Sequence, residues 1–330
     1  MSTVAEHSAA PYISVVLPFY NEAGSVAALF DRLLAVLESV GETWEIICVN
    51  DGSRDETLAA LLATRSREPR IAVIDFSRNF GKECALAAGL KRTRGRAVVV
   101  MDADLQHPPE AIPEMVARWR EGFELVNATR HERTGQALHY RLAARTFYSL
   151  MRSVSEISVA STVGDFRLLD RRVVDVVNAM PERRRLLKGL LSWVGFRQVN
   201  IVYRQEVRHG GRSTWNFVRL ARLAFDGLTS FSTVPLSIWG LIGFAVSALT
   251  FLYIVYRLIR VAIWDVDIPG YESIIIAVMF LGGMQLLSLG ILGAYLGRVF
   301  EEVKQRPLYI VRQVYEGEPA RANARKSAAS

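Results

Sequence analysis

Residues 98–109 read VVVMDADLQHPP, and this stretch decides the fold. Its four leading apolar residues are typical of a strand buried on both faces, as in a parallel sheet covered by helices above and below. The run ends at Asp102 and Asp104, which predicts carboxylates at the carboxyl end of a central strand, where open α/β sheets bind their ligands. Asp102, Asp104 and Gln106 offer oxygens suited to one hard divalent cation. The simpler alternative for an Asp-x-Asp triplet alone is a polar turn.

Apolar runs alternate with helical patterns before this stretch. The patterns predict strands at residues 13–17, 44–49, 71–76 and 97–101, and helices over 26–40, through Leu62 and through Lys91. Alternation at this spacing predicts right-handed parallel crossovers and therefore a doubly wound, mostly parallel α/β sheet. Each polar insertion follows a strand, so the loops are expected to converge on one cleft.

The composition indicates an anionic partner and a membrane. The chain has 330 residues, 51% of them hydrophobic, and a formal net charge of +7. Its pI of about 9.6 fits nucleic acid, a phosphorylated substrate or acidic lipid, and its mean hydropathy of +0.18 is high for a soluble enzyme. Two cysteines, Cys48 and Cys84, are too few for a disulfide framework and are expected to be reduced. The first eleven residues have no apolar run, so no cleavable signal peptide is expected.

Two long apolar segments occupy the last third of the chain. No Asp, Glu, Lys, Arg or His occurs in residues 227–256 or 273–297, and each segment exceeds the length of about 20 apolar residues that spans a bilayer. A short acidic turn between them predicts a hairpin with both flanks on one side. The flanks carry Arg and Lys, so the positive-inside rule predicts an inner-membrane protein with the catalytic domain and both termini in the cytoplasm. The alternative is a buried pair of helices in a soluble protein.

These patterns divide the chain into segments. We expect a polar arm at 1–11, a catalytic domain at 12–214, an interfacial connecting helix at 215–232, transmembrane helices at 233–262 and 272–298, and a cytoplasmic segment with a disordered tail at 299–330. Glycines recur along the second span, which predicts close helix contact and a homo-oligomer.

Four ordered motifs resemble glycosyltransferase family two: LPFYNE at 17–22, NDGSRD at 50–55, RNFGK at 78–82 and DADLQ at 102–106. The resemblance implies a GT-A fold and a nucleotide-sugar donor. It also implies that Asp102, Asp104 and Gln106 hold Mg²⁺ or Mn²⁺ against the donor diphosphate, as a Lewis acid. Many members carry a first acid where this chain has Asn50. The donor-binding residues implied are Pro18, Tyr20, Glu22, Asp51 and Asp102.

The end of the chain narrows the choice of acceptor substrate. LGILGAYLGR at 289–298 and EEVKQRPLY at 301–309 resemble the polyprenyl-phosphate branch of the family, which includes the bactoprenol glucosyltransferases and dolichyl-phosphate mannose synthase. The resemblance implies transfer of glucose from UDP-glucose to undecaprenyl phosphate. By the same resemblance Asp165 lies where inverting members place a base, so Asp104 and Asp165 are the predicted catalytic residues. A turn or N-cap role is the alternative for Asp165.

Basic residues in the middle of the chain are predicted to bind phosphate groups, since arginine pairs with them in a bidentate way. Arg141 and Arg145 are four residues apart and so share a face of a predicted helix. For any one arginine the alternative is a solvated surface charge. The predicted phosphate ligands are Arg130, Arg141 and Arg145 for the acceptor, and Arg208, Arg212 and Ser213 for the donor.

Two other functions remain open. A processive polysaccharide synthase would share the first domain, but it would usually carry more spans and a Gln-x-x-Arg-Trp segment, which is absent from this sequence. A non-catalytic basic protein anchored to the membrane is the alternative from another class. It leaves the carboxylate loops unexplained, because carboxylates repel phosphate backbones, and we therefore expect no nucleic-acid partner.

Overall fold

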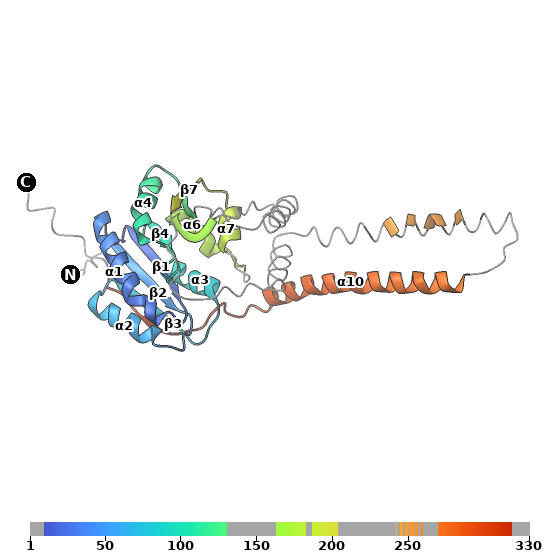
Figure 1. Cartoon of the computed structure of the whole chain (residues 1–330), viewed down its shortest axis with the longest axis horizontal. Helices are drawn as coiled ribbons and strands as arrows, with labels where there is room; N and C mark the ends of the chain where they lie inside the picture. The colour runs from blue at the N-terminus through green and yellow to red at the C-terminus, as the bar shows by residue number, and fades with distance from the viewer. Residues whose placement is uncertain are drawn as a thin grey trace, which may run out of the picture. The chain divides into compact units, whose positions relative to one another are not determined.

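An eight-stranded sheet forms the centre of the catalytic part of the chain (Figure 1). The structure, a computed structural model, describes residues 10–130, 163–182, 187–203 and 270–318, with scattered helical positions between 242 and 259. The strand order is β7-β5-β6-β4-β1-β2-β3-β8.

The first half of the sheet is parallel. Strand β1 (Ile13–Phe19) pairs with β2 (Trp44–Asn50) on one side and β4 (Ala97–Val100) on the other, and β2 pairs with β3 (Ile71–Phe76). The crossovers are α1 (Ala23–Val40), α2 (Thr57–Arg67) and α3 (Lys82–Arg92). The predicted mostly parallel, doubly wound sheet is confirmed.

Both faces of the central strand are buried, which explains its unbroken apolar pattern. Val99 and Met101 belong to a core under α1, α2 and α4 (Ile112–Arg120), which follows a short 3₁₀ turn, η1 (Pro109–Ala111). Val98 and Val100 belong to a second core, under α3, α6 (Arg171–Ala179) and α7 (Leu187–Trp193). A strand covered by helices on both sides needs apolar residues at every position.

The second half of the sheet contains antiparallel pairs. Strand β6 (Val163–Asp170) runs antiparallel to both β4 and β5 (Leu125–Arg130), and β5 pairs in parallel with β7 (Gln198–Tyr203). Strand β6 lies outside the strands that the apolar pattern predicts. Its insertion beside β4 brings Asp165 to the sheet.

The carboxyl-terminal segment also contributes a strand. β8 (Val311–Tyr315) pairs antiparallel with β3 at the edge of the sheet. Tyr309 stacks on Phe76 with ring centroids 5.0 Å apart, and Ser77 N–H donates to the Ile310 carbonyl at 3.0 Å. The segment that follows the apolar helix therefore belongs to the catalytic sheet, although the sequence predicts no strand there.

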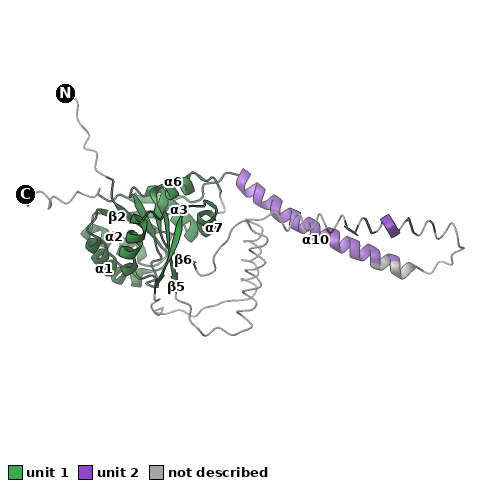
Figure 2. Cartoon of the chain, turned by 90° about the horizontal axis from the view of Figure 1, so that it is seen from above, with its two compact units in different colours: residues 1–148, 157–214, 307–330 green, residues 149–156, 215–306 purple. Residues whose placement is uncertain are grey.

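The chain divides into two compact units (Figure 2). One comprises residues 1–148, 157–214 and 307–330, and the other comprises 149–156 and 215–306. Within the second unit, α10 (Tyr271–Val303) contains a stretch, Ala277–Val303, that is long and apolar enough to cross a membrane. It is the one such helix among the described residues. Most of the first predicted span lies outside them, so the hairpin stays a prediction.

Candidate active site

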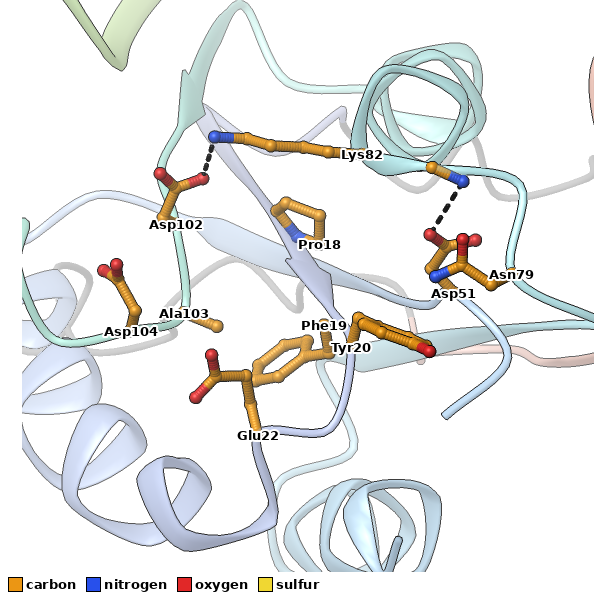
Figure 3. A pocket seen from close by; sticks show the side chains of 11 residues that line it. Pro18, Phe19, Tyr20, Glu22, Asp51, Asn79, Lys82, Asp102, Ala103 and Asp104 are labelled. Atoms are coloured by element: carbon orange, nitrogen blue, oxygen red, sulfur yellow. Dashed lines mark hydrogen bonds and ion pairs between the residues drawn. The ribbon is translucent and has the colours of Figure 1, made fainter. Parts of the chain in front are cut away.

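Loops that follow β1, β2, β3 and β4 line one pocket of about 270 Å³ at the carboxyl edge of the sheet (Figure 3). The pocket confirms the predicted convergence of the loops. Five further residues, Phe19, Asn79, Gly81, Lys82 and Ala103, complete its lining, whereas Gln106 is not part of it. Six predicted site residues line it: Pro18, Tyr20, Glu22, Asp51, Asp102 and Asp104.

Hydrogen bonds join the loop after β1 to the loop after β2. Asn21 N–H donates to Ser53 Oγ at 3.0 Å, and its side-chain oxygen accepts from Arg54 N–H at 2.9 Å. Glu22 N–H donates to Thr57 Oγ1 at 2.9 Å. Asn21 has φ of 54°, a left-handed conformation that Asn tolerates better than most residues. The loops that carry Tyr20, Glu22 and Asp51 therefore form one wall of the pocket.

Asp51 holds the loop after β3 in place. One of its carboxylate oxygens accepts from Phe80 N–H at 2.7 Å, and the other accepts from Gly81 N–H at 2.9 Å. The residue is buried, and burial raises the pKa of the carboxyl, although the two backbone hydrogen bonds and Arg78 oppose that effect. Asp51 thus organises the pocket wall, a role additional to the predicted contact with the donor.

The DADLQ loop is a tight turn. Asp102 N–H donates to Nδ1 of the buried His107 at 3.1 Å, and the His107 ring stacks on Phe166 at 5.3 Å. Asp104 Oδ1 accepts from Gln106 N–H at 3.1 Å across Leu105, whose φ is 61°. A bulky residue with positive φ is strained, and such strain gathers at functional sites. No local sequence signal indicates this conformation.

A cluster of charged side chains adjoins the pocket. Lys82 Nζ lies 2.5 Å from Asp102 Oδ1 and 2.5 Å from Asp165 Oδ2. Lys188 Nζ lies 3.0 Å from the other oxygen of Asp165. Burial by itself raises the pKa of Asp165, but the two ammonium groups outweigh it and lower this pKa to about 2. Asp165 is therefore fully ionised at neutral pH.

A partly buried glutamate positions the helix that carries Lys188. Glu83, the second residue of α3, accepts from the N–H of Leu187, the first residue of α7, at 2.9 Å. Burial and the charge of Asp165 raise the pKa of Glu83, although the Leu187 hydrogen bond, Lys82 and Lys188 oppose them. This bond links α3 to the start of α7, next to Lys188. No sequence pattern predicts a role for Glu83 or Lys188, and none does for Lys82, although Lys82 ends the RNFGK motif.

The pocket offers a partial set of metal ligands. Within the described residues, no three His, Cys, Asp or Glu side chains gather in a way that could hold a metal ion. Asp102 and Asp104 nevertheless supply two carboxylates, and Mg²⁺ is commonly held by one or two carboxylates together with substrate phosphates. These two carboxylates therefore fit a divalent ion whose remaining coordination positions would be filled by a nucleotide diphosphate.

Of the six predicted phosphate ligands, only Arg130 lies among the residues that the structure describes. Arg130 is the last residue of β5, beside Tyr203 of β7 in the strand register. Arg130 is therefore placed where β5 ends. Its contact with an acceptor stays a prediction. The other five predicted phosphate ligands lie outside the described residues: Arg141, Arg145, Arg208, Arg212 and Ser213.

The mostly parallel sheet and the carboxylate-lined pocket at its carboxyl edge agree with the GT-A fold that the motifs predict for a glycosyltransferase. The chain belongs to glycosyl transferase family 2, whose family model matches residues 14–177. This result confirms the resemblance that the four motifs carry.

Relatives match almost the whole chain. An uncharacterized glycosyltransferase, sll0501, from Synechocystis sp. is 46% identical over 303 residues, covering 92% of this chain and 95% of the relative. The SfII prophage-derived bactoprenol glucosyl transferase of Shigella flexneri is 39% identical over 307 residues, covering 93% and 99%. The bactoprenol glucosyl transferase of Shigella phage SfX is 39% identical over 300 residues, covering 91% and 98%.

Similarity to solved structures is weaker. Glucosyl-3-phosphoglycerate synthase from Mycobacterium tuberculosis, in a complex with Mn²⁺, UDP-glucose and phosphoglyceric acid, is 23% identical. The alignment covers 67% of this chain and 79% of that chain, with a TM-score of 0.44. A likeness at this level carries no argument about function.

Proposed function

We propose that this chain is a membrane-anchored, inverting glycosyltransferase that moves glucose from UDP-glucose to a polyprenyl phosphate, undecaprenyl phosphate in bacteria. The observation that carries the proposal is the extent of the similarity to bactoprenol glucosyl transferases. At 93% coverage, the alignment leaves out fewer residues than the 33 of α10, so it includes part of the apolar helix as well as the catalytic domain.

The pocket supplies the groups that a nucleotide sugar needs. Tyr20, which is 44% exposed, offers a ring face to the base, and Asp51 lies in the wall beside it. Asp102 and Asp104 would hold a divalent ion, Mg²⁺ or Mn²⁺, which offsets charge on the leaving diphosphate when bound. The predicted phosphate ligands of the middle segment would complete the site: Arg208, Arg212 and Ser213 for the donor, and Arg130, Arg141 and Arg145 for the lipid phosphate.

The ion pairs of Asp165 and the charge of a phosphate acceptor both favour inversion. A phosphate monoester has a second pKa of about 6, so the acceptor is largely dianionic at neutral pH and needs little help from a base. Asp165, with a pKa of about 2, is a weak base, and both its oxygens already contact ammonium groups. It is therefore better suited to orienting groups than to forming a covalent sugar intermediate, as retention would require. A β-linked product from α-linked UDP-glucose is the expected outcome.

A donor panel tests the proposal. The full chain in detergent would be incubated with undecaprenyl phosphate, Mn²⁺ or Mg²⁺ and one nucleotide sugar at a time, and lipid-linked product would be identified by mass. We expect hexosyl-phosphoryl-undecaprenol from UDP-glucose and none without the lipid. Absence of lipid-linked product with every nucleotide sugar would contradict the proposal, and an α-linked product by NMR would contradict inversion.

The membrane part of the proposal places the protein in the inner membrane. The two predicted spans, 233–262 and 272–298, would form a hairpin with the catalytic domain and both termini in the cytoplasm, where nucleotide sugars are made. Basic residues on both flanks of the hairpin support this orientation. Close contact along the glycines of the second span would give a homo-oligomer.

A further inference from the structure

Lys82 bridges two acidic residues that lie far apart in the sequence: Asp102, in the loop after β4, and Asp165, in β6. It is the first residue of α3, and its ammonium nitrogen lies 2.5 Å from Asp102 Oδ1 and 2.5 Å from Asp165 Oδ2. Figure 3 shows the Lys82 side chain crossing the top of the pocket to reach Asp102. The ammonium group thus lies at an oxygen that a divalent ion in the pocket would use.

A lysine and a divalent ion compete for such an oxygen. Two cations held at one carboxylate oxygen repel each other, and the repulsion is stronger near a protein surface than in bulk water. Lys82 lines the pocket and its side chain is 39% exposed, so the ammonium group has room to move away from Asp102. Its backbone stays in place, because the preceding Gly81 N–H donates to Asp51.

Lys188 makes a different set of contacts with the same cluster. Its ammonium nitrogen lies 3.0 Å from Asp165 Oδ1, the oxygen that Lys82 does not contact. Asp165 therefore keeps one ammonium partner when Lys82 shifts. The two lysines differ in their contact with Asp102. Lys82 forms an ion pair with Asp102, whereas the ion pair of Lys188 is with Asp165.

We infer that Lys82 is a positioning residue that acts as an internal counter-cation: in the nucleotide-free protein it forms ion pairs with Asp102 and Asp165 and competes with the divalent ion for Asp102. The donor diphosphate brings the negative charge that both cations need, so the ion binds well only together with the nucleotide. This inference rests on the proposed metal site at Asp102 and Asp104. It gives Lys82, which is not a ligand of the ion, control over when the ion binds.

Binding of Mn²⁺ to the full chain in detergent tests the inference without any transfer reaction. Free Mn²⁺ would be followed by electron paramagnetic resonance, with and without UDP. We expect Lys82→Met to bind Mn²⁺ roughly tenfold more tightly than the wild type when UDP is absent, and the difference to shrink when UDP is present. Lys82→Arg keeps the charge and should bind as weakly as the wild type without UDP.

Lys188→Met is the matched control. It removes an ammonium group from the same cluster but leaves the Lys82 contact with Asp102, so Mn²⁺ affinity without UDP should stay close to that of the wild type. Lys82→Gln provides a second neutral side chain if the Met variant does not fold, and thermal unfolding of each variant separates loss of stability from altered binding.

The outcomes separate this inference from the proposed function. If the wild type binds Mn²⁺ with UDP, but Lys82→Met and Lys82→Gln show unchanged affinity without it, Lys82 does not compete for Asp102 and only the inference is overturned. If the wild type binds no Mn²⁺ even with UDP, both the proposed metal site and the inference are wrong. Glucosyl transfer to undecaprenyl phosphate, measured separately, tests the proposed function itself.

Discussion

Gly52, in the loop after β2, has no room for a side chain. Its φ is +62°, and a Cβ atom there would lie 2.3 Å from the carbonyl carbon of Arg78 and 2.5 Å from the nitrogen of Asn79. These are backbone atoms of the loop that Asp51 holds through Phe80 and Gly81. A side chain at position 52 would therefore push apart the two loops that form one side of the site.

Gly52→Ala should destabilise the protein by at least about 2 kcal/mol and weaken UDP binding, because both the backbone conformation and the contact exclude a methyl group. Chemical denaturation and a UDP titration measure the two effects. Gly24→Ala is the matched control: Gly24 lies in α1 with open space around it, so the change should stay within about 1 kcal/mol of wild type. Equal behaviour of the two variants would refute the argument.

Asp104→Asn should abolish transfer while leaving the fold intact. The asparagine oxygen can still accept the hydrogen bond from Gln106 N–H, so the turn is kept, but the charge offered to the ion is lost. Lewis-acid stabilisation is worth several kcal/mol, so turnover should fall at least about 100-fold. Gln106→Ala should be milder, since water can replace a neutral ligand. If Asp104→Asn kept near wild-type turnover and unchanged metal dependence, Asp104 would not be a ligand of the ion.

The low pKa of Asp165 predicts that the folded protein loses stability in acid. Its folded-state pKa, about 2, lies below its ordinary value of 3.8, so its contribution is fully present above about pH 4 and is lost as the pH falls toward 2. Lys188→Met removes one ammonium partner and should raise this pKa, so that stability is lost at a higher pH than in the wild type. Urea unfolding of both proteins between pH 2 and pH 6 measures the shift, and coincident pH profiles would contradict it.

At the scale of secondary-structure elements, β8 links the carboxyl-terminal segment to β3, whose following loop lines the pocket. It covers the outer edge of β3, and Arg312 donates to the Ser77 carbonyl at 2.9 Å, just before the pocket loop. Tyr309 stacks on Phe76, whose ring meets Phe80 edge-on at 5.7 Å. The aromatic contacts thus lead from the carboxyl-terminal segment to a residue that donates to Asp51.

Tyr309→Ala should lower the free energy of unfolding by about 1–2 kcal/mol and weaken UDP binding, because it removes a stacked ring from the loop support. Tyr309→Phe keeps the stacked ring and should therefore stay closer to the wild type than Tyr309→Ala does. Val311→Ala is a control on the same segment, since Val311 is 37% exposed and should change little. If Tyr309→Ala binds UDP as the wild type does, the stacking of Tyr309 on Phe76 does not support the pocket.

At the scale of the whole molecule, α10 has exposed apolar side chains at described positions from Ile274 to Val303. Val278, Met279, Leu286 and Leu296 are each more than 60% exposed. Such a surface is costly in water and favourable in hydrocarbon, and a 27-residue stretch is long enough to cross a bilayer. The helix therefore favours a membrane-embedded segment between the catalytic residues and β8.

Cysteine labelling in intact bacterial cells tests the proposed topology. In a Cys84→Ser background, where the remaining Cys48 is buried, Asp267→Cys lies between the predicted spans and Lys304→Cys follows α10. We expect an impermeant maleimide to label position 267 in intact cells and position 304 only after permeabilisation. Labelling of position 304 in intact cells, or of neither position before permeabilisation, would contradict the hairpin.

The sequence by itself determined the parts of this protein that local pattern encodes. Residues 98–101, with Val98 and Val100 in one core and Val99 and Met101 in the other, required a strand covered on both faces. The parallel crossovers then brought the carboxylates and loop motifs to one edge, because the carboxyl ends of parallel strands lie together. The predicted pocket residues met there for this reason.

Only the tertiary structure decided the contacts between distant segments. Lys82 and Asp165 are 83 residues apart, and Arg312 lies 237 residues from Asp75, so no periodicity or motif spacing links them. The antiparallel strands β6 and β8 join the sheet through long connections, and their short sequences carry no signal of which neighbour they pair with. Local patterns report burial and chain direction, whereas partners far apart in sequence are chosen by packing and charge in the folded chain.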